Sequence, residues 1–138
     1  MSNAKKVSSL MGQCSYHEDN KAAFKRSGMG LLREVVKLLG LAKGTYALRY
    51  NAGGIAVSGE CILRAENVYV QVCADIDFGV LVRTCNGRTG DGANCWYSWR
   101  RLEADGAKGL ADFVEGVRAG RLGALAAVET RLQPIIRL

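Results

Sequence analysis

The chain has 138 residues, of which 49% are hydrophobic and 23% are charged, and its formal net charge is +6. This balance predicts a globular domain with a buried core and excludes an intrinsically disordered chain. No run approaches the roughly 18 uninterrupted apolar residues of a membrane span, and the first residues lack the apolar stretch of a signal peptide. We therefore expect a cytoplasmic protein, without a membrane partner.

A long helix is predicted from about Glu18 to Leu39, because apolar residues recur there at helical spacing and Gly40 is a natural C-terminal stop. Asp19 or Asn20 is expected to cap its start. Gly28 and Gly30 interrupt its middle and indicate a break or a close contact with another backbone. The predicted apolar face comprises Phe24, Leu31, Leu32, Val35, Val36, Leu38 and Leu39.

The excess of positive charge lies in this helix and in the strand that follows it. Such a basic face can attract phosphates, although a solvated helix face that keeps a protein soluble is the commoner origin of the pattern. Between residues 21 and 49, Glu34 stands alone against Lys21, Lys25, Arg26, Arg33, Lys37, Lys43 and Arg49.

After Gly44 the pattern changes to the alternation of apolar and polar residues that is typical of strands. Four strands joined by short connections predict an antiparallel meander. They are expected at residues 46–51, 55–64, 68–73 and 80–85.

Two further helices are predicted near the C-terminus. Asp105 can cap the first, which ends at Gly120, and residues 122–132 form a shorter apolar helix. The apolar end at residues 134–138 is expected to pack on the core or on another subunit.

The element order predicts an α+β fold with an N-terminal helix, a four-stranded antiparallel meander and two C-terminal helices packed on one face of the sheet. Residues 1–17 are expected to be an N-terminal arm, and residues 18–138 a single α+β domain. The other face of the sheet, or one end of it, is then available for a ligand or an oligomer contact.

The segment from Arg83 to Arg101 concentrates glycines, arginines and large aromatic residues. Its turn at residues 87–94 has neither the spacing of a P-loop nor that of a dinucleotide-binding turn. It can be an anion cradle, in which Arg88 and backbone amides hold a phosphate while Asn94 bonds a base or sugar, or a surface loop made of ordinary turn-forming residues.

The aromatic and basic residues after this turn have two interpretations each. Tyr97 or Trp99 could stack on a base, while the same alternation suits core packing. Arg100 and Arg101 are expected at the surface, where they contact phosphates or form ordinary ion pairs.

Catalytic and metal sites are not predicted. The five cysteines are most simply reduced thiols that pack as small hydrophobic residues. Cys14 and His17 have the spacing of half a zinc site but lack a second close pair, so His17 is expected at the surface or at a helix entry. Because Asp91 is the only acid between Asp77 and Glu103, paired carboxylates have little support, and we predict a protein without enzymatic activity or cofactor.

Four stretches resemble small proteins encoded by bacteriophages and prophages: LLREVVKLLGLAKGTY, GGIAVSGE, VYVQV and RTCNGRTGDGAN. The resemblance covers roughly Phe24 to Trp99. It implies a counter-defence factor that sequesters a nucleotide signal of bacterial immunity or blocks a CRISPR effector complex. The sequestering kind implies a homo-oligomer with ligand pockets between subunits.

We therefore expect a phage-type binding protein that captures a phosphate-bearing nucleotide. The alternatives are an inhibitor that docks on a host defence protein and a domain that binds RNA or DNA. The predicted ligand-binding residues are Arg88, Asn94, Tyr97, Trp99, Arg100 and Arg101.

Overall fold

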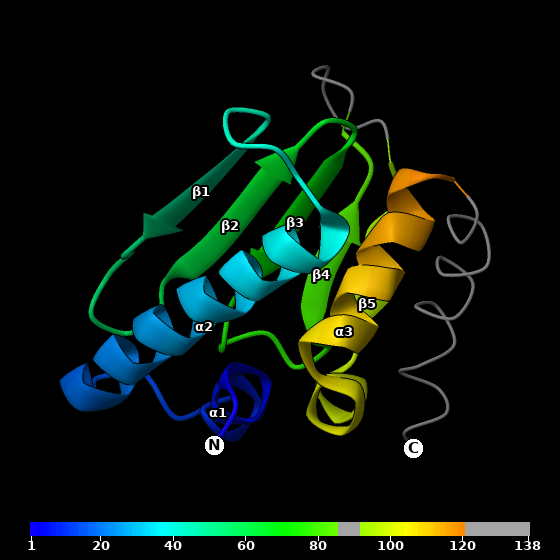
Figure 1. Cartoon of the computed structure of the whole chain (residues 1–138). Helices are drawn as coiled ribbons and strands as arrows, with labels where there is room; N and C mark the ends of the chain where they lie inside the picture. Colours follow the sequence, from blue (N-terminus) through cyan, green and yellow to red (C-terminus); the bar gives the residue numbers. More distant parts are fainter. Residues whose placement is uncertain (86–91, 121–138) are drawn as a thin grey trace.

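The computed structural model describes residues 1–85 and 92–120 as an α+β arrangement (Figure 1). The elements in chain order are α1 (Asn3–Ser9), α2 (Glu18–Leu39), β1 (Tyr46–Asn51), β2 (Glu60–Ala65), β3 (Val68–Val72), β4 (Val80–Arg83), β5 (Cys95–Tyr97) and α3 (Trp99–Arg118). In these two ranges, no helix has the length and apolar character needed to cross a membrane.

The strands form one antiparallel sheet in the order β1-β2-β3-β4-β5, so each strand pairs with its neighbour in sequence. The helices lie on one face of the sheet, as Figure 1 shows, and the core fills the space between the two layers. The predicted α+β class and the antiparallel meander are thus confirmed. The opposite face of the sheet carries no helix within the described residues.

The sheet has five strands in place of the four predicted. Residues 95–97 form β5, which was too short and too close to the glycine turn to be recognised from alternation. The second strand starts at Glu60 and not at residue 55, because Ser58 bonds elsewhere: its backbone N–H donates to Asp75 Oδ2 at 2.8 Å, and its hydroxyl accepts from Ala74 N–H at 3.0 Å. These bonds hold residues near Ser58 against the end of β3 and outside the ladder.

Helix α2 has the predicted limits but a different cap. His17 is the N-cap, and its Nδ1 accepts a hydrogen bond from the backbone N–H of Asn20 at 3.1 Å, which replaces the expected cap by Asp19 or Asn20 itself. The helix ends at Gly40 in the left-handed conformation, as predicted. Leu38, predicted to belong to the apolar face, is 52% exposed, whereas the next residue, Leu39, packs against the core.

Gly28 does not break α2, which continues through it. It marks a close approach, since a Cβ atom at this position would lie 2.6 Å from Cys61 Sγ on β2. The absence of a side chain at Gly28 therefore lets α2 lie directly on the sheet and buries Cys61 completely.

The first seventeen residues contain helix α1, which packs against α2 and α3. Its Ala4 and Val7 are buried, as are Leu10 and Cys14 after it. This part of the chain thus contributes to the same core as the rest of the domain.

Helix α3 begins earlier than predicted. Ser98 is its N-cap, with the side chain accepting from the backbone N–H of Arg101, so the helix begins before Asp105, the expected cap. The helix is broken at Gly106, whose φ of 68° and ψ of −158° suit glycine only. The predicted helix at residues 122–132 and the apolar C-terminus lie outside the described residues.

Burial of Cys61 predicts a loss of stability at alkaline pH. Burial is the main cause that raises the pKa of this thiol from 9.0 to about 12. In the unfolded chain the thiol loses its proton near pH 9, so unfolding releases a proton between the two values, and the free energy of unfolding falls by about 1.4 kcal/mol per pH unit there. We expect Cys61→Ala to show a shallower alkaline loss in urea titrations at several pH values. If the free energy of unfolding fell equally steeply with pH in both proteins, the raised pKa of Cys61 would be contradicted.

Candidate functional site

The predicted ligand-binding residues that lie in the described ranges do not come together in one site. Arg88 lies outside the described residues. Asn94 is exposed just before β5, and Arg100 is exposed in the first turn of α3. Between them, Tyr97 and Trp99 belong to the core, with 0% and 6% exposure.

The packing of the two aromatic residues shows why they cannot present a ring to a base. The Tyr97 ring packs against Phe113 of α3, with 5.2 Å between ring centroids. Trp99 lies at the start of α3, and its indole Nε1–H donates to the carbonyl of Ile76 at 2.8 Å, which ties α3 to the turn before β4. Both residues hold α3 on the sheet.

Arg101 lies beside Tyr97 on the helix side of the sheet, at a groove next to the break in α3. Its guanidinium carbon is 4.6 Å from the centroid of the Tyr97 ring. The groove has a volume of about 580 Å³. It is balanced in charge, because Asp105 and Asp112 line it together with Arg101 and Lys108, and Lys108 pairs with Asp112 at 2.7 Å. This balance makes the groove a poor site for phosphate.

A more basic surface lies on the helix-free face of the sheet. Cys61 packs under α2 and Tyr97 packs under α3, so the residues that alternate with them point away from the helices. Across the five strands, this helix-free face carries Ala47, Arg49, Asn51, Glu60, Ile62, Arg64, Tyr69, Gln71, Leu81, Arg83 and Trp96.

Strand register brings three of these residues into one row. Arg64 on β2 is directly opposite Tyr69 on β3, and Tyr69 is directly opposite Arg83 on β4. The guanidinium carbons of Arg64 and Arg83 lie 5.5 Å and 4.9 Å from the centroid of the Tyr69 ring. The Tyr69 hydroxyl donates to Gln71 Oε1 at 2.7 Å, which fixes the ring on the strand. We call Arg64, Tyr69 and Arg83 the Arg-Tyr-Arg row.

Arg49 adds a third guanidinium next to this row. It is opposite Ile62 on β2, and Ile62 is two positions from Arg64, so Arg49 and Arg64 are diagonal neighbours on the same face. Burial raises the pKa of the Tyr69 hydroxyl and Glu60 adds to the rise, while Arg83, Arg64 and Arg49 oppose it. The tyrosine thus lies in the field of all three arginines.

The three arginines outnumber the one acid on the strands of this face, Glu60, which is a diagonal neighbour of Arg49. The ion pairs Lys108–Asp112 and Arg118–Glu115 lie elsewhere, on α3. The Nε of Arg83 is buried and has no hydrogen-bond partner in the described part of the chain. Three guanidinium groups against one carboxylate favour the binding of an anion.

An aromatic pair lies on the same face. Trp96 on β5 is directly opposite Leu81, and its ring centroid lies 5.4 Å from that of Phe78, with the rings tilted by 44°. Phe78 comes from the turn before β4 and is 36% exposed. A partly open aromatic surface therefore accompanies the arginines.

The thiols and the histidine have structural surroundings. Burial is the main cause that raises the pKa of Cys14, Cys73 and Cys95, so these thiols are not activated as nucleophiles. His17 caps α2. Across residues 1–85 and 92–120, no three side chains of His, Cys, Asp or Glu are grouped so that they could hold a metal ion.

The sequence left the face of the sheet without helices available for a ligand but did not identify its residues, because these are spread over several strands. Its signal is the alternation of Arg49, Arg64, Tyr69 and Arg83 with apolar residues, which places them on a common face only once the register is known. Comparisons of the chain with protein-family models, with curated proteins and with solved structures found no match, so the geometry of this face is what bears on function.

Proposed function

We propose that this protein binds phosphate-bearing nucleotides, without catalysis, on the helix-free face of its sheet. The observation that carries the proposal is the Arg-Tyr-Arg row with Arg49 beside it, three guanidinium groups against the single carboxylate of Glu60 on the strands of this face. Guanidinium groups bind phosphate oxygens through two parallel hydrogen bonds, which makes arginine well suited to this ligand.

The aromatic pair supports a nucleotide over a simple anion. Bases stack on aromatic rings and on guanidinium planes, and each stacked base contributes about 1–3 kcal/mol to binding. Phe78 offers a partly exposed ring beside Trp96, and Arg64 is exposed. Phosphate and base can therefore both be contacted from one face.

Charge argues against a second copy of the chain as the occupant of this face. In a symmetric dimer the same patch would meet itself, and the arginines of the two copies would be brought together. Like charges opposed across an interface are unfavourable. A polyanion removes this repulsion.

The proposal is tested by calorimetry with a short single-stranded oligonucleotide, a panel of cyclic and linear nucleotides, and inorganic polyphosphate of equal charge. We expect the oligonucleotide or a nucleotide to bind about tenfold more tightly than polyphosphate, because only the former stack. The affinity should fall as salt is added, because phosphate contacts release counterions. Absence of binding across the whole panel at low salt would refute the proposal, as would equal affinity for polyphosphate.

A further inference from the structure

We propose that the ligand is an extended single strand of nucleic acid, whose phosphate backbone continues from the helix-free face, around the edge strand β1, onto the basic side of α2. This inference rests on the proposed function and names its ligand class. Its geometric basis is a basic stripe on α2 that meets the helix-free face at the end of β1.

The basic stripe consists of Lys21, Lys25, Arg26 and Arg33, and the last three of these line one groove along α2. At its start the stripe lies toward β1, since Lys25 Nζ lies over the Tyr50 ring. The acid Glu34 lies on another side, where its Oε2 accepts from Asn3 Nδ2 of α1 at 3.0 Å. Glu18 lines a groove together with Lys21 and Lys25, so the stripe has four positive charges with one carboxylate beside it and stays basic.

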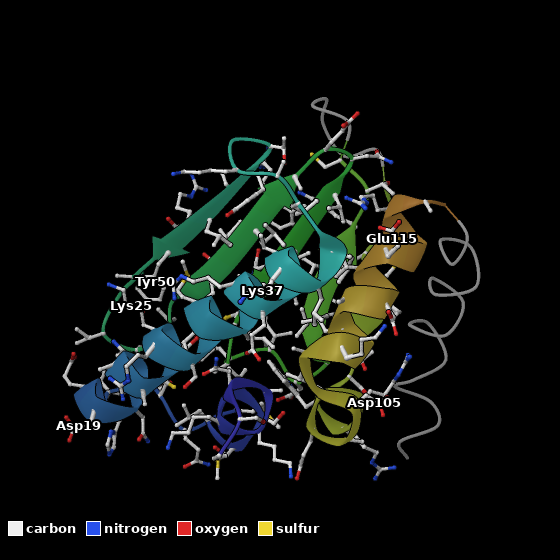
Figure 2. All side chains as sticks on the ribbon, in the orientation of Figure 1. Asp19, Lys25, Lys37, Tyr50, Asp105 and Glu115 are labelled. Atoms are coloured by element: carbon white, nitrogen blue, oxygen red, sulfur yellow. The ribbon has the colours of Figure 1, made fainter. Side chains whose placement is uncertain are left out.

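The edge strand connects the two basic surfaces. Arg49 points to the helix-free face, and the next residue, Tyr50, points to the helix side. There Lys25 Nζ lies 4.9 Å from the centroid of the Tyr50 ring, and Figure 2 shows the two side chains together beside β1. Arg49 and Lys25 thus lie on opposite sides of β1, with only this strand between them.

Two grooves follow the stripe. One, of about 330 Å³, lies between α2 and the loop after β1 and is lined by Lys21, Lys25 and Tyr50, among others. The other, of about 400 Å³, lies along α2 between Lys25 and Arg33. If the basic residues of α2 served only to keep the helix solvated, there would be no reason for them to line grooves or to lie next to the arginines of the sheet.

A strand bound in this way explains why basic residues lie on both sides of the sheet edge. A free nucleotide is too small to contact Arg83 and Arg33 at once. A single strand bound by an OB-fold domain, by comparison, contacts it over about 4–16 nucleotides. Each phosphate contact also adds to the salt dependence, with a slope of about 0.7 per contact for single strands. The dependence of affinity on strand length and on salt concentration therefore tests whether the basic stripe contacts the nucleic acid.

The test compares strands of about 4 and about 12 nucleotides by fluorescence anisotropy at several salt concentrations. The parent protein should bind the longer strand at least tenfold more tightly. The double variant Lys25→Gln/Arg33→Gln should lose about tenfold in affinity for the longer strand, with a salt slope lower by about 1.4, and change less than about twofold for the shorter one. The matched control Lys5→Gln/Lys6→Gln removes the same charge from α1 and should change neither strand.

Several outcomes would overturn the inference while leaving the proposed function intact. These are equal affinity of the parent protein for both lengths, an equal loss in the α1 control, or binding of poly-glutamate of matched charge as tight as that of the longer strand. If no strand or nucleotide binds at all, the proposed function itself fails. Thermal melting of each variant shows that the compared proteins are folded.

Discussion

The double variant Arg64→Gln/Arg83→Gln should bind a short single-stranded oligonucleotide about 100-fold more weakly than the parent protein. Each substitution removes one charge-assisted contact to phosphate, and a loss of about 1.4 kcal/mol per contact corresponds to tenfold in affinity. The salt dependence should fall as well, by about 1.4 in the logarithmic slope. Anisotropy titrations at several salt concentrations measure both quantities.

Two comparisons make this prediction specific to the Arg-Tyr-Arg row. Arg83→Lys keeps the charge but loses the planar guanidinium, so its affinity should lie between those of the parent and Arg83→Gln. Tyr69→Phe keeps the ring between the arginines and should bind nearly as well as the parent, whereas Tyr69→Ala should not. Unchanged affinity in the double arginine variant, with the melting temperature preserved, would place the site elsewhere on the molecule.

The part of the fold that follows from short-range patterns could be predicted from the sequence. Helical periodicity and Gly40 defined α2, and alternation defined β1 and β3 almost to the residue. The capping residues could not be predicted, because a cap is a single hydrogen bond whose acceptor depends on local geometry. His17 and Ser98 supply that acceptor here, although several neighbouring polar residues had the right chemistry.

The candidate site could be predicted less well, because polar residues that are close together in the sequence need not be close together in the folded chain. Alternation already separates Tyr97 from Trp96, but only the position of α3 shows that Tyr97 is on the covered face. The Arg-Tyr-Arg row needs the register of three strands, which no local pattern contains. Arg83 is the first residue of the polar segment at residues 83–101, but its contact is with Tyr69 on the neighbouring strand β3.

Gly79→Ala should be among the most destabilising single substitutions in this domain. Gly79 precedes β4 with a φ of 131°, a conformation that residues with a side chain rarely adopt. A Cβ atom there would collide with the Tyr97 carbonyl oxygen and lie 2.8 Å from Ser98 Cα, and backbone atoms cannot move aside as a flexible side chain can. Strain and overpacking together should lower the free energy of unfolding by about 3 kcal/mol or more.

The matched control for this change is Gly54→Ala. A Cβ atom at Gly54 meets nothing within 4 Å, and its φ is outside the left-handed region, so its stability should stay within about 0.5 kcal/mol of the parent. Urea titration of the three proteins checks the order. Gly79 adjoins Phe78 and the contact between β4 and β5. Those Gly79→Ala molecules that remain folded should therefore also lose the preference for nucleotide over polyphosphate. A stable Gly79→Ala protein would mean that β4 does not meet the start of α3 as closely as the structure has it, and the aromatic part of the site would then need a different position.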